Sequence, residues 1–376
     1  MTTVSTDKPF RFYDNRQKYL QFVTTTNEKW KVAERVAQEL TNLRPVPPAL
    51  RVFDAGVGDG TVLGHLLRAM HQQYPTVPFY VVGKEISLED VRLTMEQLPD
   101  RFMEHPQSVV VLTNLHYAES PWLKPKTDDK QKRMVMKHVE LTGEDSFSFG
   151  EQLRALDDFL VEHWAVAPSE KTGNPLYTTP TALVLYRGDQ KFALHDVIPQ
   201  PGQYEADYDL VIASQPWRSR TNAEFKVQKI LCPLSRALRT SGVLIGIQSA
   251  GGDPGLEIIE RIWPEADPFP VDRHELLKVL HAELGDAAKS FDLMAMPDHQ
   301  SRLTYEMHTL PSEIGLSIGT STLFAAWNAA IYVAQIEDER VEEAARDGSY
   351  LEATAEVLKK HGGLWFHDET FLIRRN

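Results

Sequence analysis

One run of residues combines an acidic side chain with closely spaced glycines. It reads Asp54-Ala-Gly56-Val-Gly58-Asp-Gly60 and lies at the end of a short apolar stretch, LRVFDA. Glycines permit the backbone angles of a tight turn and let a ligand approach the main chain. A dinucleotide-binding turn has the spacing G-x-G-x-x-G, whereas here the third glycine comes one residue early. The carboxylate of Asp54 would repel a pyrophosphate and suits a cationic ligand, so the run argues against a dehydrogenase.

Alternating apolar runs and helical stretches surround this turn. The predicted strands are 50–55, 79–82, 109–112, 208–213 and 243–248, and the predicted helices between them are 61–73, 87–98 and 223–238. Such alternation with nearly continuous apolar strands is typical of a parallel sheet covered on both faces. Ligands bind such sheets at the carboxyl ends of the strands. The predicted fold class is therefore α/β, a Rossmann-like sheet with helices on both faces.

The strand, acid, glycines and helix around residues 54–60 together resemble the first motif of class I S-adenosylmethionine-dependent methyltransferases. The resemblance implies a seven-stranded methyltransferase sheet and S-adenosyl-L-methionine as the cofactor. It puts Gly56, Gly58 and Gly60 under the ribose and methionine portion of the cofactor, and Asp54 near the methionine ammonium. The alternative is an ordinary glycine-rich turn between a strand and a helix.

Two later strand ends supply further candidate cofactor ligands. Glu85 ends the second strand, where an acidic residue can accept hydrogen bonds from both ribose hydroxyls, and the family uses the same device. Ile86 follows it and can pack on the adenine. After the third strand, Asn114 and Leu115 occupy the family's adenine-contacting loop. That loop often carries an Asp, but Asn114 can still hydrogen-bond the adenine edge.

The fourth strand ends in Ser214-Gln215-Pro216-Trp217, the predicted catalytic loop. It resembles the Asp/Asn/Ser-Pro-Pro-aromatic loop of amino-group methyltransferases, and Gln215 departs from that pattern. The resemblance implies that Ser214 and backbone carbonyls orient an amine toward the methyl group. It also makes Trp217 an aromatic wall, which suits a cationic transition state. The alternative is a turn whose Trp only packs.

Residues 1–48 are predicted to form an N-terminal helical lid. Two short helices are expected between residues 15 and 43, with a break near 24–27. In many relatives such helices close over the cofactor, and Tyr13, Tyr19 and Asn27 are the candidate contributors from this segment.

The rest of the chain divides into a predicted core and an insertion. Residues 120–205 are far longer than one crossover helix needs and contain strand-like runs at 133–141, 181–188 and 191–198. They are predicted to be an inserted β-rich subdomain. Residues 49–119 and 206–376 form the predicted methyltransferase core.

Composition limits the choice of partners. The 376 residues carry 40 Lys+Arg and 53 Asp+Glu, a formal charge of −13, so nucleic acid is a disfavoured partner. No run approaches the roughly 18–20 apolar residues of a membrane span, and no apolar signal segment is visible. Scattered histidines and one cysteine predict no metal site. We expect a cytoplasmic enzyme, and the helix FAAWNAAIYVAQI predicts either a core contact or a homodimer face.

The leading hypothesis is a methyltransferase that transfers a methyl group to nitrogen of a small molecule by in-line displacement. Such a reaction depends mainly on alignment and desolvation. An oxygen acceptor is the variant that would require a general base. The alternatives are a nucleic-acid or protein amino-group methyltransferase, suggested by the SQPW loop, and a catalytically inert cofactor-binding scaffold.

Overall fold

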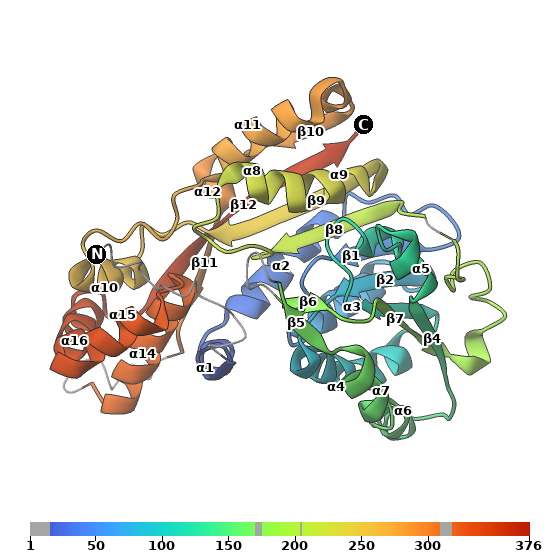
Figure 1. Ribbon diagram of the computed structural model, residues 1–376, viewed down its shortest axis with the longest axis horizontal. Coiled ribbons are helices and arrows are strands. Elements are labelled where there is room, and N and C mark those ends of the chain that lie inside the picture. Colours follow the sequence, from blue (N-terminus) through green and yellow to red (C-terminus); the bar gives the residue numbers. More distant parts are fainter. Residues whose placement is uncertain (1–15, 170–174, 204, 309–317) are drawn as a thin grey trace.

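A ten-stranded mixed sheet forms the centre of the computed structural model, which describes residues 16–169, 175–203, 205–308 and 318–376 (Figure 1). The strand order is β10-β12-β9-β8-β1-β2-β3-β7-β4, and β11 pairs with β12. The strands are β1 (Leu50–Asp54), β2 (Phe79–Lys84), β3 (Ser108–Thr113), β4 (Val135–Leu141), β7 (Thr181–Arg187), β8 (Tyr208–Ser214), β9 (Leu238–Ser249), β10 (Phe291–Met294), β11 (Arg302–Glu306) and β12 (Trp365–Arg375). A separate short ladder joins β5 (Val166–Pro168) to β6 (Pro175–Tyr177).

The helices lie between and around these strands. They are α1 (Arg16–Thr25), α2 (Glu28–Leu40), α3 (Thr61–Gln73), α4 (Leu88–Glu104), α5 (Asp128–Lys132), α6 (Ser146–Arg154), α7 (Asp157–His163), α8 (Ala223–Lys226), α9 (Cys232–Arg236), α10 (Pro254–Ile262), α11 (Arg273–Leu284), α12 (Asp298–Ser301), α14 (Thr320–Val333), α15 (Asp338–Asp347) and α16 (Ser349–His361). Among the described helices, none combines the length and apolar character that a membrane crossing needs.

The predicted α/β class is confirmed, but the expected count of seven strands is wrong. β1, β2, β3, β8 and β9 run parallel, so their carboxyl ends share one edge of the sheet. Two strands of the segment 120–205 add to the sheet: β7 pairs antiparallel with β3, and β4 pairs with β7. An open edge at β3 would expose unpaired N–H and C=O groups, and the extension satisfies them. The division of the chain into domains remains a prediction.

The strand expected at residues 191–198 does not form. The backbone there makes turns, with the N–H of Leu194 donating to Gln190 and the N–H groups of Val197 and Ile198 donating to Leu194. These apolar side chains are nevertheless buried. Leu194, Val197 and Ile198 belong to a buried cluster with residues of the sheet, whereas Phe192 is 96% exposed, so the buried residues of this run do not alternate as in a strand.

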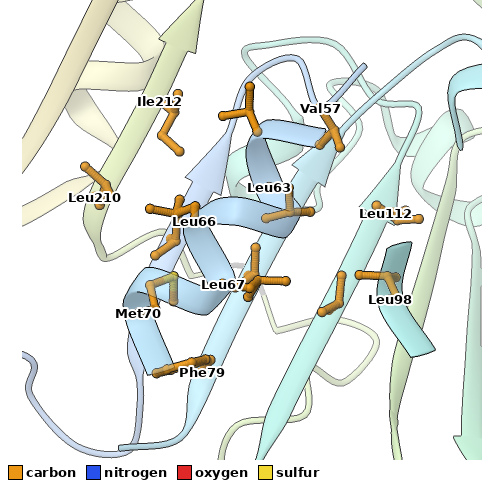
Figure 2. Packing of buried hydrophobic residues seen from close by; sticks show 14 of the residues in the cluster. Val57, Leu63, Leu66, Leu67, Met70, Phe79, Leu98, Leu112, Leu210 and Ile212 are labelled. Atoms are coloured by element: carbon orange, nitrogen blue, oxygen red, sulfur yellow. The ribbon is translucent and has the colours of Figure 1, made fainter. Parts of the chain in front are cut away.

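Helix α3 holds the glycine turn in place. Its apolar face, with Leu66, Leu67 and Met70, packs on Phe79 of β2 and Leu210 of β8 (Figure 2). This cluster is completely or almost completely buried. Because the turn leads directly into α3, the packing positions the start of the helix at the carboxyl end of β1.

Candidate functional site

Two of the three predicted cofactor glycines occupy backbone positions that favour glycine. Gly58 has φ 58° and Gly60 has φ 81°, both in the left-handed region. A Cβ atom on Gly60 would lie 2.7 Å from Cα of Thr94, and one on Gly58 would lie 3.2 Å from the hydroxyl of Tyr19. Gly56 has no atom within 4 Å of such a Cβ, so open space surrounds it. The turn is therefore closely packed at Gly60 and open at Gly56.

Asp54 lies at the end of β1 beneath this turn. It is 2% exposed, and its Oδ1 accepts a hydrogen bond of 3.0 Å from the N–H of Gly56. Burial raises the pKa of Asp54 to about 6, against the lowering effects of the Gly56 N–H and the charge of Lys29. A buried carboxylate of this kind favours a bound cation, because a cation offsets the cost of its desolvation.

Glu85 follows β2, and its carboxylate contacts the same turn. Its Oε2 accepts from the N–H of Gly58 at 3.0 Å, and its Oε1 accepts from the N–H groups of Ile86 and Ser87 at 2.7 and 2.9 Å. A carboxylate has about four acceptor positions, so these three bonds leave one. Glu85 therefore ties the glycine turn to the end of β2, and its predicted role as ribose ligand stays a prediction.

Lys29, which the sequence analysis missed, lies near these carboxylates. Its Nζ is 5.8 Å from the ring centre of Tyr19 and 3.4 Å from Oε2 of Glu28. Burial lowers the pKa of Lys29, but Glu28, Tyr19 and Asp59 raise it, and the net direction is upward. Lys29 is in the first turn of α2, where a cation opposes the helix dipole. That unfavourable placement was the available sequence signal.

The candidate lid residues lie in different parts of the structure. Tyr19, on α1, lies over the turn at Gly58, and burial raises its pKa. Asn27 precedes α2, but its Oδ1 accepts from the N–H of Glu306 at 2.8 Å, so its side chain joins this segment to β11. Tyr13 lies outside the described residues. Of the lid candidates within the described residues, Tyr19 lies at the glycine turn and Asn27 lies at β11.

Asn114 is held by the segment 120–205. Its Nδ2 donates to the carbonyls of His163 and Thr179 at 3.0 and 2.9 Å, and its Oδ1 accepts from the N–H of Thr181 at 2.9 Å. Both donors are therefore in use. Leu115 beside it is fully buried. The structure gives Asn114 a backbone-clamping role, while its assignment to adenine remains a prediction.

The SQPW loop follows β8 with an unusual backbone. Gln215 has φ 49°, a left-handed conformation for a residue other than glycine. Its Nε2 donates to Oγ of Ser249 at 2.9 Å and to Oδ1 of Asp368 at 3.2 Å. The carbonyl of Pro216 accepts from the Tyr117 hydroxyl at 2.7 Å. Ser214 is half-buried at the strand end. Gln215 thus links the carboxyl ends of β8 and β9 to the start of β12.

Trp217 is a core residue in this structure. It is 5% exposed, and its indole N–H donates to Oε1 of Gln248 at 3.0 Å. It belongs to the apolar cluster between the sheet and the helices α8, α9 and α11. This burial favours the alternative in which the Trp packs, because a ring covered by the core presents little face to an acceptor.

We therefore expect Trp217→Ala to lower the free energy of unfolding by about 3–5 kcal/mol, the range for removing a buried aromatic. Denaturant unfolding of both proteins measures this. Trp30→Ala is the matched control, because Trp30 is 59% exposed and its loss should cost about 0.5 kcal/mol or less. Equal destabilisation by the two changes would contradict the core assignment of Trp217.

Comparison with known proteins gives distant likenesses only. No family model and no curated protein sequence matches the chain. Among the described residues, no group of three or more His, Cys, Asp or Glu side chains is arranged to hold a metal ion. One similar solved structure is assigned as a sarcosine dimethylglycine methyltransferase of Galdieria sulphuraria; it is 10% identical, with 93% of this chain and 85% of that chain covered and a TM-score of 0.37.

Two further solved structures are similar, each with a lower TM-score. One is geranyl diphosphate methyltransferase in complex with GPP and sinefungin, 14% identical, covering 92% of this chain and 76% of that one, with a TM-score of 0.33. The other is the cyclopropane synthase MmaA2 from Mycobacterium tuberculosis, 12% identical, covering 91% and 83%, with a TM-score of 0.33.

Proposed function

We propose that this chain is an S-adenosylmethionine-dependent methyltransferase acting on a small molecule, with nitrogen as the acceptor atom. The observation that carries the proposal is the turn at the carboxyl end of β1. Buried Asp54 lies beneath it, the left-handed Gly58 and Gly60 form it, and Glu85 reaches it from β2. A buried carboxyl group beside an exposed backbone position at Gly56 suits a ligand that carries an ammonium group.

Each residue at this site would contact a different part of the cofactor. Asp54 would hold the ammonium of the methionine portion, and Glu85 would hold the ribose through its remaining acceptor position. Lys29 would hold the methionine carboxylate, since it is a cation close to Asp54 and Tyr19. S-adenosylmethionine, when bound, supplies an electrophilic methyl group. Ser214, at the end of β8, would orient the acceptor nitrogen, and Tyr19 would exclude water from above the turn.

Lys29→Met is expected to weaken binding of S-adenosylhomocysteine, the demethylated cofactor, about tenfold, the scale of one charge-assisted contact. Calorimetry measures this. Lys31→Met is the matched control on the same helix, because its ammonium pairs with Glu34 near the surface. 5′-Methylthioadenosine has no amino-acid portion, so both variants should bind it like the wild type. An unchanged affinity for S-adenosylhomocysteine in Lys29→Met would remove Lys29 from the site.

The reaction itself is tested with S-adenosylmethionine labelled on its methyl group. The purified chain is incubated with the small-molecule, RNA and protein fractions of a cell extract in separate reactions. Label in the small-molecule fraction is the expected result. Label in RNA or protein would support the amino-group alternative. Bound cofactor with no labelled product in any fraction would support the inert scaffold.

A further inference from the structure

A buried carboxyl group with no role in the proposed cofactor site lies beside the SQPW loop. Asp368, on β12, is fully buried and pairs in register with Ser249 of β9. Its Oδ1 accepts from Nε2 of Gln215, but its Oδ2 has no hydrogen-bond partner among the described residues. A buried polar atom without a partner costs free energy. A ligand that pairs with Oδ2 would recover this cost.

The side chains with the strongest effects on the carboxyl group of Asp368 are acidic or neutral. Glu28 on α2 and Asp253 before α10 raise the pKa of Asp368 beyond the effect of burial, while Ser249 and Gln215 lower it. On β11, burial raises the pKa of Tyr305, and Asp368 and Glu28 raise it further. Glu28 is only 4% exposed, and its Oε2 lies 3.4 Å from Nζ of Lys29, so this carboxylate already has a cationic partner. Asp368 makes no ion pair among the described residues, and a cation beside it would offset the burial of its carboxyl group.

A cavity reaches the same carboxyl group. It has a volume of about 320 Å³, and Asp368 lines it together with Ala250, Gly251 and Gly252 after β9. Both glycines have positive φ, 71° and 70°, so this wall of the cavity is backbone without side chains. Two arginines, Arg273 and Arg302, also border the cavity; the guanidinium of Arg273 is engaged by Glu369 and Asp298. The cavity places a small organic molecule against the wall that contains Asp368, and contact with Oδ2 itself requires a small movement of this wall, because the side chain is 0% exposed.

Asp368 also adjoins the glycine turn through the start of α2. Glu28 faces Asp368, and the next residue, Lys29, acts on Asp54 and Tyr19. Asp368 and the glycine turn are therefore close to each other, because the consecutive residues Glu28 and Lys29 lie near one and near the other. In addition, Gln215 of the SQPW loop contacts Asp368 directly. A molecule held at Asp368 would lie next to the loop that is proposed to orient the methyl acceptor.

We propose that Asp368 binds the protonated amino group of the methyl acceptor and takes a proton from it, an inference that rests on the proposed function. The ammonium pairs with Oδ2, and the N–H proton moves to that oxygen. The electron pair of the broken N–H bond stays on nitrogen as the lone pair that a methyl acceptor needs. The substrate class is thus a small aliphatic or aromatic amine. Glu28 adds negative potential without touching the transferred proton.

The test compares amines with alcohols of the same carbon skeleton: ethylamine with ethanol, propylamine with propanol, and benzylamine with benzyl alcohol. Binding is measured by ligand-observed NMR, with and without S-adenosylhomocysteine. The wild type is expected to bind each amine about tenfold more tightly than its alcohol, the scale of a charge-assisted hydrogen bond. Equal binding of amines and alcohols by the wild type would overturn the proposal, without need of any variant.

Asp368→Asn keeps the size of the side chain and an oxygen for Gln215. It is expected to reduce the preference for amines to about twofold or less, because the negative charge is gone. The control Asp292→Asn makes the same charge change on β10, where the carboxylate contacts Asn376, and should keep the tenfold preference. A retained preference in Asp368→Asn would overturn the proposal. Failure of the wild type to bind S-adenosylhomocysteine would instead overturn the proposed function, since the amine preference is measured without it as well.

Discussion

Asp54→Ala is expected to weaken binding of S-adenosylhomocysteine by about 1–3 kcal/mol, the range for a lost charge-assisted contact in a buried site. The carboxyl group is 2% exposed, so little solvent screens its attraction for the ligand's ammonium. Calorimetric titration at neutral pH measures the change. Asp145→Ala, which removes an exposed carboxylate that caps α6, is the control and should leave the affinity unchanged. Unchanged binding by Asp54→Ala would refute the role of this residue.

The same carboxyl group predicts a pH dependence. Its pKa in the folded protein is about 6, above the ordinary value of 3.8, so the free protein takes up a proton there as the pH falls. A bound ammonium favours the ionised carboxylate, and the affinity should therefore fall as the pH drops through about 6. The folding stability depends on pH in the opposite direction to the affinity. The contribution of Asp54 to stability is fully present below pH 3.8 and is lost as the pH rises through 6. In Asp54→Ala, both of these pH-dependent contributions, to affinity and to stability, should be absent.

Glu369→Gln is expected to lower the free energy of unfolding by about 3 kcal/mol. Glu369 and Arg273 are 5% and 7% exposed, and Glu369 accepts from Nη1 and the backbone N–H of Arg273 at 2.8 and 2.7 Å. Removing one member of a buried ion pair leaves the other charge uncompensated and costs about 3–5 kcal/mol. The lower end applies here because Asp298 still pairs with Arg273.

Denaturant unfolding measures the effect of this change, and Asp298→Asn provides its control. The Asp298 side chain is 83% exposed, so breaking its pair with Arg273 should cost about 1 kcal/mol or less. If the two variants lose the same stability, the pair between Glu369 and Arg273 is not the buried contact that fixes β12 to the start of α11.

Local patterns were sufficient to predict the elements that carry the proposed cofactor site. The spacing of apolar residues predicts helix 61–73, and α3 has those bounds; Ser87 was expected to begin the next helix, and it caps α4. Gly58 and Gly60 have the left-handed angles that the turn was expected to need. These features depend on neighbouring residues in the chain, so a local reading of the sequence captures them.

Long-range contacts account for what the sequence analysis missed. Asp368 lies near the start of β12, and this strand runs antiparallel to β9, so its start and not its end lies at the ligand edge of the sheet. The residues at strand ends therefore do not include Asp368. The contacts of Asn114 were missed for a similar reason: its partners, His163, Thr179 and Thr181, come from a segment about 50–70 residues further along the chain.

Titration of the purified wild-type chain with S-adenosylhomocysteine by calorimetry tests the central claim most directly. One molecule is expected to bind per chain, with an affinity that decreases when the pH falls below about 6, where Asp54 becomes protonated. If the folded chain shows no heat of binding at any pH between 5 and 8, a range of about 1–2 units around that pKa, the turn at residues 54–60 does not hold this nucleoside and the account is wrong.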